Sequence, residues 1–411
     1  MKEDDPPEVY VATTLTYGVR SSGNQAITGV RLVAEHSREE FPEVYDILTK
    51  QIYVDDVLPA GRPSLDECFT LADQITVVAE RGGLRLKPFA FTSVPPGESI
   101  TVDGISIDVA GLKWVTPMDT LHFKIGALNF AKKYRGKKPT NPECYFIPIK
   151  LTRRICAGKV GEVWDLIGLL VPITARLKLD LHELVVLKLN WDDEIPEELR
   201  KLWKENFELI NQLDHLQFSR ATVPADAVNL EMETIEAGDA SKDLMCMAVY
   251  VRFKRKGGEY SCELVVGKSK IVPSGMSIPR AELLAAEINA VIGHVVHRAF
   301  GDKVVNRYKI TDSRIAIHWI HAWEKVLKLW IRNRVNEILR LSTLSDWYWI
   351  PGSQMPCDIG TRRTATLSDV GDGSSWKEGL PWMRDSSSNF PIKTIEEVKW
   401  MQRRKERMRR K

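Results

Sequence analysis

The chain lacks the features that mark secreted, membrane-spanning or zinc-binding proteins. Its six cysteines include no Cys-x-x-Cys pair, which excludes the common zinc and redox motifs. No run approaches the ~18 apolar residues of a membrane helix, and the acidic, proline-containing start is unlike a signal peptide. The Asp-Thr-Gly and Asp-Ser-Gly triplets of aspartic proteases are also absent. We therefore expect an intracellular protein, cytoplasmic or nuclear, with reduced thiols and no protease activity.

The length of 411 residues and the apolar content of 44% predict two or three domains with a sizeable core. The formal net charge is only +3, but basic residues are concentrated at the end of the chain. Thr394 and Glu397 have the spacing of a capping box, which predicts a terminal helix. Such a helix either binds nucleic-acid phosphates or is simply solvated, and the sequence favours neither. Its basic residues are Arg403, Arg404, Lys405, Arg407, Arg409, Arg410 and Lys411.

The first 130 residues combine strand-like and helical patterns. Strand-like segments occur at 9–16, 84–91 and 105–114, and helical periodicity occurs at 26–40 and 64–83. Between these elements the sequence QIYVDDVL (51–58) places two aspartates side by side, although strands are poor in Asp and like charges repel. A tight hairpin explains the pair, and so does a site for a divalent cation. The pair alone favours the hairpin without excluding the cation.

The second half begins with a polar, basic stretch at 131–148, which predicts an exposed linker. Residues 150–215 are strongly helical, and a boundary is expected near 220–228. Beyond it the patterns predict three strands, a long helix that starts near Pro279, a fourth strand, two helices and a short fifth strand. The fold class is therefore α/β or α+β.

Four carboxylates fall at the ends of these later elements. They are Asp239, Glu282, Asp312 and Asp358, separated by 43, 30 and 46 residues. Each one alone has a structural explanation, as a turn residue, a helix-dipole partner, an N-cap or a surface charge. Together, without His or Cys, they are the donors that Mg²⁺ or Mn²⁺ prefers, and two such ions can support hydrolysis of a phosphodiester.

Five segments resemble the ribonuclease H domain of Bel/Pao-type retrotransposons, and a sixth resembles the family's closing segment. They are AGDASK (237–242), GKSKIVPSGMSIPRAELLAAEI (267–288), ITDSRIAIHWI (310–320), WIRNRVNEI (330–338), WIPGSQMPCDIGTRR (349–363) and WKEGLPWM (376–383). The resemblance implies a mixed five-stranded sheet with flanking helices and a site for two Mg²⁺ or Mn²⁺ ions. In that site Asp239 would bridge both ions, Glu282 and Asp312 would hold the first, and Asp358 would hold the second.

The chain departs from this family just before the last aspartate. The family usually has Asn-Pro-Ala there, whereas Met355, Pro356 and Cys357 precede Asp358 in this sequence. A counterpart of the loop histidine that aids product release in some relatives is not evident. His318 and His321 fall on a predicted helix, and we expect them to be structural.

The first part of the chain resembles the later motifs of a Bel/Pao reverse transcriptase. The matching stretches are TYGVRSSGNQA (16–26), IYVDDVL (52–58), GGLRLK (82–87) and GLKW (111–114). The resemblance implies that Tyr53, Asp55 and Asp56 lie on a palm hairpin, with Asp55 as a metal ligand and Asp56 as a supporting carboxylate. It also implies that Gly23 and Gln25 line the template or nucleotide side. Lys87 is the candidate contact for the incoming phosphate.

Such a polymerase needs a further metal-binding Asp well upstream and a fingers subdomain, but only 54 residues precede Asp55. We therefore expect polymerase activity to be lost in this chain. The predicted regions are a partial palm (1–130), a helical thumb- or connection-like region (131–228), a ribonuclease H-like domain (229–385) and a basic helix or tail (386–411).

Three functional hypotheses follow. The first is a metal-dependent endonuclease that cleaves RNA in RNA/DNA hybrids, with the 2′-OH distinguishing RNA from DNA. The second is an inactive remnant or host-encoded protein that binds nucleic acid without cleaving it. The third is reverse transcription, in a longer polyprotein only. All three imply nucleic acid as the partner and none implies a membrane, and the sequence does not indicate an oligomeric state.

Overall fold

The computed structural model describes residues 19–53, 56–62, 64–92, 106–132, 137–322 and 325–409, the last six of these by backbone alone. It divides the chain into two compact units. The first unit comprises residues 1–110 and 114–118, and the second comprises 111–113 and 119–411.

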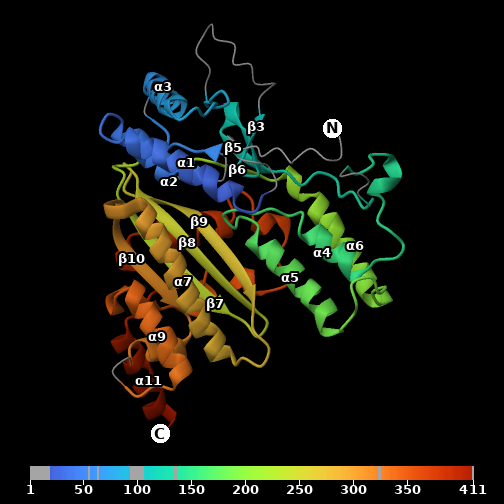
Figure 1. Cartoon of the computed structure of the whole chain (residues 1–411). Coiled ribbons are helices and arrows are strands. Elements are labelled where there is room, and N and C mark those ends of the chain that lie inside the picture. Colours follow the sequence, from blue (N-terminus) through green and yellow to red (C-terminus); the bar gives the residue numbers. More distant parts are fainter. Residues whose placement is uncertain are drawn as a thin grey trace, which may run out of the picture. The chain divides into compact units, whose positions relative to one another are not determined.

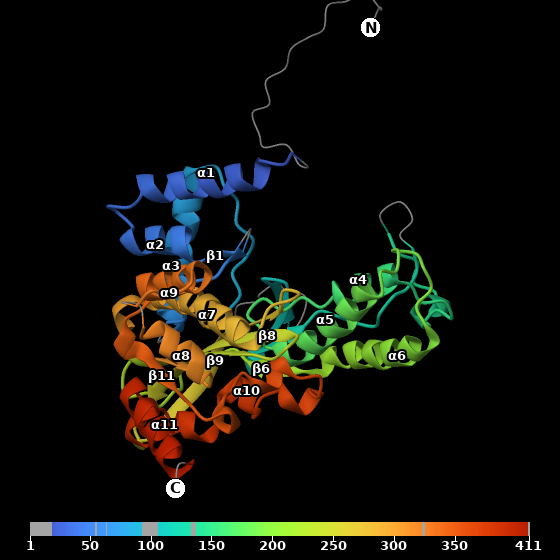
Figure 2. The ribbon, with the colours of Figure 1, turned by 90° about the horizontal axis from the view of Figure 1, so that it is seen from below.

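The first unit is built on three helices, shown in Figure 2: α1 (Ser22–His36), α2 (Pro42–Lys50) and α3 (Leu65–Arg81). Their apolar faces meet in one cluster that includes Val44, Ile47, Ile75 and Val78. The helix predictions for 26–40 and 64–83 are thereby confirmed, and Ser64 accepts a hydrogen bond from the backbone of Glu67 at the start of α3.

Asp56 lies in an antiparallel strand pair, in accord with the hairpin interpretation. Strand β1 (Ile52–Tyr53) pairs antiparallel with β2 (Asp56–Val57), and Asp55 lies outside the described residues. The strand predicted at 84–91 is wrong, because these residues have no regular structure, and Pro88 supplies no N–H for a ladder there. Strands β3 (Ser106–Val109) and β4 (Leu112–Val115) follow where the chain passes to the second unit. The predicted strand 9–16 also lies outside the described residues.

A mixed five-stranded sheet forms the centre of the second unit, which confirms the predicted sheet. Its order is β11-β10-β7-β8-β9, in which β10 runs parallel to β7 and β11 while β7, β8 and β9 are antiparallel. The strands are β7 (Met232–Ala240), β8 (Leu244–Lys254), β9 (Tyr260–Ile271), β10 (Val304–Thr311) and β11 (Trp347–Trp349).

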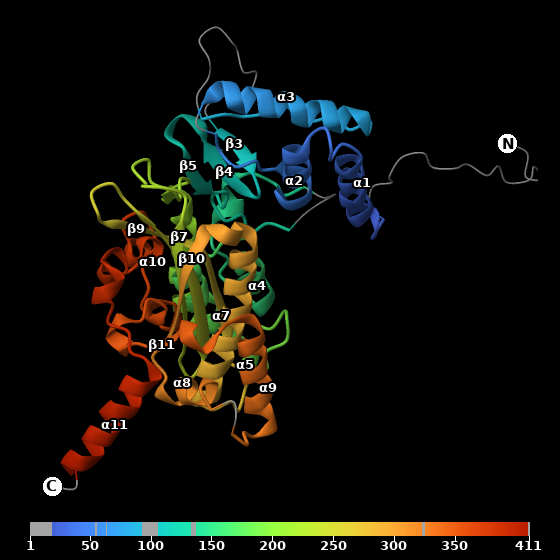
Figure 3. The same cartoon turned by 90° about the vertical axis from the view of Figure 1, so that its left-hand side faces the viewer.

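Both faces of this sheet are covered. Helix α7 (Ile278–Phe300) lies along one face of the sheet (Figure 1). Met245 and Met247 of β8 pack against this helix. Helices α8 (Arg314–Ile320) and α9 (Leu329–Leu341) pack beside α7. On the other face, Trp376 of α10 (Ser375–Glu378) packs edge-on against Tyr250. Figure 3 shows α7 and α10 on opposite sides of the sheet.

The helical region before the sheet belongs to the same unit. It contains α4 (Arg153–Val160), α5 (Val171–Val186) and α6 (Glu197–Asn211). Helix α5 packs on the face opposite α7, since Ala175 and Leu179 contact Leu244 and Ile271 of the sheet. Lys178 of α5 also donates to the Ser269 hydroxyl on β9 at 2.9 Å. The proposed boundary near residue 228 therefore falls inside one compact unit.

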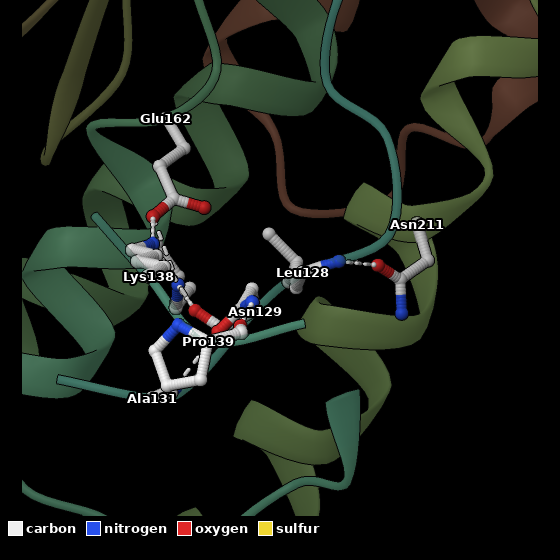
Figure 4. A network of polar contacts seen from close by, with 8 residues as sticks. Leu128, Asn129, Ala131, Lys138, Pro139, Glu162 and Asn211 are labelled. Carbon is white, nitrogen blue, oxygen red and sulfur yellow. Dashed lines mark hydrogen bonds and ion pairs between the residues drawn. The ribbon is translucent and has the colours of Figure 1, made fainter. Parts of the chain in front are cut away.

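A short two-stranded ladder and a polar network complete this helical region. Strand β5 (Thr120–Phe123) pairs antiparallel with β6 (Gln217–Ser219). Lys138 donates to Glu162 at 2.9 Å and to the Asn129 carbonyl, and Asn129 donates to the Pro139 carbonyl (Figure 4). Lys159 contacts the same carboxylate at 2.8 Å. These two lysines therefore connect the segment around Asn129 to the C-terminal end of α4 and are not free basic groups.

Charged side chains lie inside the sheet domain beneath α7. Glu236 on β7 is fully buried and forms ion pairs with Lys309 and Arg307 on the adjacent strand β10, the latter at 3.1 Å. Gly293 of α7 covers this cluster, and a Cβ there would lie 1.7 Å from a Glu236 oxygen. Only glycine therefore lets the helix approach the ion cluster so closely.

The terminal helix is present as predicted. Helix α11 (Ile395–Arg409) begins with the expected capping box, in which Thr394 and Glu397 each accept from the other's backbone N–H. Ile395 and Val398 are buried at its base. All six cysteines are free thiols, four of them buried. Among the described residues, no helix combines the length and apolar character needed to cross a bilayer.

Candidate active site

The strand topology brings the predicted acids to one edge of the sheet. Asp239 is the last but one residue of β7, and Asp312 directly follows β10. Because β7 and β10 are parallel neighbours, their carboxyl ends meet at the same edge. Glu282 lies near the start of α7, which covers β7, and Asp358 begins the short 3-10 turn η7 (Asp358–Thr361). Four elements that are distant in sequence therefore supply these carboxylates.

The pKa shifts show that the four carboxyl groups share one electrostatic environment. Burial, together with the smaller effects of the charges on Asp239, Glu282 and Asp358, raises the pKa of Asp312 to about 7. Burial also raises the pKa of Asp239, where Asp358 adds to the effect. The same holds for the pKa of Glu282, where Asp239 adds to the effect of burial. Like charges thus repel one another across this edge of the sheet.

Two of the four acids are held by neighbouring hydroxyl groups. Thr361 is buried, and its hydroxyl donates to Asp239 Oδ2 at 3.0 Å and lies equally close to the Asp358 carbonyl. The hydroxyl of Ser313 donates to Glu282 Oε2 and also caps α8 by accepting from a backbone N–H. Each hydroxyl fixes the direction of one carboxylate.

The other two acids differ in their partners. Arg362 binds both oxygens of Asp358, with Nε–Oδ1 at 2.9 Å and Nη2–Oδ2 at 2.6 Å. Asp312 Oδ1 is buried, and among the described residues it has no hydrogen-bond partner. A buried carboxylate oxygen without a donor is unfavourable, and a cation would remove that cost.

Turn η7 lies directly on strand β8. A Cβ at Gly360 would be 2.3 Å from Cys246 Sγ, and Cys246 is the cross-strand neighbour of Asp239. Cys357 is buried and donates to the Ala237 carbonyl at 3.4 Å. Met355 is buried in the same core cluster. The residues that depart from the family motif therefore fill the core beneath the acids.

The donor set fits hard divalent cations. All four candidate ligands are carboxylates, and they repel one another in the absence of a counter-charge. In the described parts of the chain, no three His, Cys, Asp or Glu side chains are already arranged to hold a metal ion. A cation would give the unpartnered Asp312 oxygen a partner and would offset the clustered negative charge. The acidic side chains would need to rotate to form the coordination shell of the cation.

As far as the structure describes them, the candidate polymerase residues of the first unit form no comparable cluster. Asp56 accepts a hydrogen bond from the Ala110 backbone N–H at 2.7 Å. Gly23 and Gln25 are exposed in the first turn of α1, and Lys87 is exposed on an irregular segment. Tyr53 pairs with Asp56 across the hairpin.

Three residues that support the site escaped the sequence predictions. Ser313 directly follows Asp312, while Thr361 and Arg362 follow Asp358 by three and four residues. The i+3 and i+4 spacing was a usable signal, since such residues face one another on a helical turn. His318 and His321 contact Gln402 and the Ile317 carbonyl respectively, in accord with structural roles.

The basic tail is described only in part. Arg403 is exposed on α11, and the side chains from Arg404 onward lie outside the description. Arg410 and Lys411 lie beyond the described residues altogether. Nucleic-acid binding by Arg404, Lys405, Arg407, Arg409 and their neighbours stays a prediction.

The chain was compared with known families and proteins. Residues 152–313 match the family described as Pao retrotransposon-like RNaseH-like domain. The N-terminal ribonuclease H domain of a Mycobacterium tuberculosis protein, solved as a fusion with maltose-binding protein, is 9% identical, with 30% of this chain and 86% of that chain covered and a TM-score of 0.22. For ribonuclease H1 of the archaeon Halobacterium salinarum the values are 13%, 30%, 87% and 0.20. These two likenesses are too distant to carry an argument. A search of the curated proteins found no match.

The sheet, its covering helices and the matched family identify a ribonuclease H-like domain. This supports classing the domain as a ribonuclease H-type endonuclease. Residues 152–313 match the Pao retrotransposon-like family of such domains. The predicted Bel/Pao relationship is confirmed for this segment, which contains Asp239, Glu282 and Asp312 and ends before Asp358. It also contains α4, α5 and α6. The reverse-transcriptase resemblance of the first unit stays a prediction.

Proposed function

We propose that this chain cleaves the RNA strand of RNA/DNA hybrids with the help of two Mg²⁺ or Mn²⁺ ions. The observation that carries the proposal is the environment of Asp312. Its carboxyl group has a pKa of about 7 because it is buried beside Asp239 and Glu282, and one of its oxygens lacks a partner. Such perturbed carboxyl groups are typical of catalytic sites.

The assignment of ligands follows from the resemblance and the chemistry of the donors. Asp239 would contact both ions, Glu282 and Asp312 the first, and Asp358 the second. When bound, such ions activate water for attack on the phosphodiester and offset the charge that develops on the leaving oxygen.

The chain's own side chains orient these ligands. Thr361 holds one oxygen of Asp239, and Ser313 holds one oxygen of Glu282. Arg362 supplies the positive charge beside Asp358 and must release at least one oxygen for a cation to bind there. Burial of Asp239 keeps water from competing with these contacts.

Recognition of the hybrid would use its backbone and its 2′-OH groups. The basic end of α11 would add salt-dependent affinity for phosphates. The six free thiols fit a reducing intracellular compartment, cytoplasmic or nuclear.

The first unit contributes no activity in this proposal. Asp56 already accepts a hydrogen bond from a backbone N–H, Tyr53 is half-buried, and Gly23, Gln25 and Lys87 are exposed. Attachment to a reverse transcriptase would then be a feature of a longer polyprotein.

The test is cleavage of a labelled RNA/DNA hybrid by the purified chain with Mg²⁺ or Mn²⁺. Asp239→Asn is expected to lower the rate by about a thousandfold or more, while Asp56→Asn changes it by less than about twofold. A folded chain that binds the hybrid but does not cleave it would instead support a non-catalytic nucleic-acid-binding protein.

A further inference from the structure

Turn η7 carries an unusual share of the site for its length. Its four residues include Asp358 and Thr361, and Arg362 follows immediately. A single 3-10 turn has poor internal hydrogen bonding and cannot fix its own position. What holds η7 in place therefore determines where the last carboxylate lies.

One contact joins this turn to a distant helix. Arg363 Nη1 lies 3.1 Å from Asp180 Oδ1 and 3.3 Å from Glu183 Oε2, both on α5. Asp180 is only 2% exposed, and its second oxygen accepts from the Asn206 side chain on α6 at 2.9 Å. Asp180 thus connects the segment after η7 to two helices.

Loss of the ion pair between Arg363 and Asp180 would be energetically costly. A buried carboxylate needs a nearby positive charge or donors, and removing its ionic partner is costly. Burial raises the pKa of Asp180, and Asn206 and then Arg363 oppose that rise. The carboxylate is therefore a fixed attachment point for the arginine.

Helix α5 itself is firmly placed. Its inner face is buried, Lys178 bonds Ser269 of the sheet, and Asp165 accepts from three backbone N–H groups just before the helix starts. Val171, the first residue of α5, lies beside Gly360 of η7. The position of α5 can therefore determine the position of η7, through packing of Val171 and through the ion pairs of Arg363.

We propose that Arg363 is a positioning residue of the site: its ion pair with Asp180 ties η7 to α5, so that the helices preceding the sheet set the position of Asp358. The inference rests on the proposed function, since it concerns the ligand of the second cation. It makes α5 part of the active-site framework.

The test measures Mn²⁺ binding to the full chain by electron paramagnetic resonance, with Arg363→Gln, Asp180→Asn and the double variant. Each single change is expected to weaken the second Mn²⁺ site about tenfold and the first by less than about twofold. The double variant should bind the second Mn²⁺ no more weakly than the single variant with the lower affinity, because both changes break the same contact. Arg363→Lys should restore part of the affinity.

Arg384→Gln is the matched control, since Arg384 pairs with Glu378 and is similarly exposed but lies apart from the acids. It should leave both Mn²⁺ sites unchanged. Suppose that the wild type binds two Mn²⁺ ions. The inference alone would be overturned if Arg363→Gln and Asp180→Asn left both sites unchanged, or weakened both sites equally and in proportion to a loss of thermal stability. A folded wild-type chain that binds no Mn²⁺ would overturn the proposed function and the inference with it.

Discussion

Two regions of this molecule place acidic residues close together, and they differ in what surrounds them. In the first unit Asp56 lies on a two-residue strand that pairs with β1, and its carboxylate accepts a hydrogen bond from a backbone N–H. In the second unit four acids from four elements converge at a sheet edge, where burial and neighbouring carboxylates raise the pKa values of Asp239, Glu282 and Asp312. The first region has two aspartates that are neighbours in sequence, whereas in the second region the fold gathers carboxylates from distant parts of the chain. The second region is therefore where we expect chemistry.

The largest expected effect concerns the buried charges beneath α7. Glu236→Gln leaves Lys309 and Arg307 without their carboxylate, because both ion pairs share Glu236. We expect the free energy of unfolding of the second unit to fall by about 3–5 kcal/mol. Urea denaturation followed by tryptophan fluorescence measures this change.

Two controls sharpen this result. Lys309→Met removes one of the two cations and should cost less, since Arg307 still pairs with Glu236. Asp46→Asn in the first unit breaks an exposed pair with Lys50 and should leave stability nearly unchanged. Equal losses from Glu236→Gln and Asp46→Asn would contradict the distinction between the two regions.

A second prediction uses pH. The folded-state pKa of Asp312, about 7, lies above its ordinary value of 3.8, so the folded chain keeps a proton that the unfolded chain loses between these values. Stability contributed by this proton is complete at low pH and lost as pH rises toward 7. In EDTA near pH 8, Asp312→Asn should raise the free energy of unfolding by about 2–4 kcal/mol, with little change near pH 4.

The matched variant for this measurement is Asp56→Asn. Its amide oxygen can still accept from the Ala110 N–H, so its stability should follow the wild-type pH profile. A destabilised Asp312→Asn at pH 8 would show that the carboxylates are not in electrostatic conflict.

The third prediction tests the seating of η7. A methyl group at Gly360 would meet Cys246 Sγ at 2.3 Å, so Gly360→Ala must displace the turn from β8. We expect a loss of about 1–3 kcal/mol in thermal or urea unfolding, together with weaker Mn²⁺ binding. Gly257→Ala is the control, since a Cβ there has open space and should change neither quantity.

The smallest effect is expected at the basic end of α11. Removing residues 403–411 deletes seven basic residues while leaving the buried Ile395 and Val398 in place. Affinity for an RNA/DNA hybrid at low salt should fall about three- to tenfold, and the salt dependence should become shallower. Fluorescence anisotropy measures both, and an unchanged salt dependence would mark the tail as a solvated helix.

Much of the fold could be predicted because its signals are local. The alternating pattern of β7, the helical periodicity of α7 and the capping box of α11 each lie within one element. All three elements are present as expected. The strand at 84–91 failed because β-favouring residues there surround a proline.

The supporting contacts of the site could not be predicted in the same way. The Thr361–Asp239 hydrogen bond joins residues 122 positions apart, and Arg363 contacts Glu183 and Asp180 of α5 across 180 and 183 positions. Such pairs depend on how η7 packs against β8 and α5, which no periodicity records. The sequence indicated the acids by type and order, but not what orients them.

The central claim is that the acids of the second unit, and not the aspartate pair of the first, hold the cations. Mn²⁺ titration of the wild-type chain, Asp239→Asn and Asp56→Asn, followed by electron paramagnetic resonance, tests it most directly. We predict two sites in the wild type, each weakened by about tenfold or more in Asp239→Asn, and both retained in Asp56→Asn. Sites that survive in Asp239→Asn but disappear in Asp56→Asn would contradict the account.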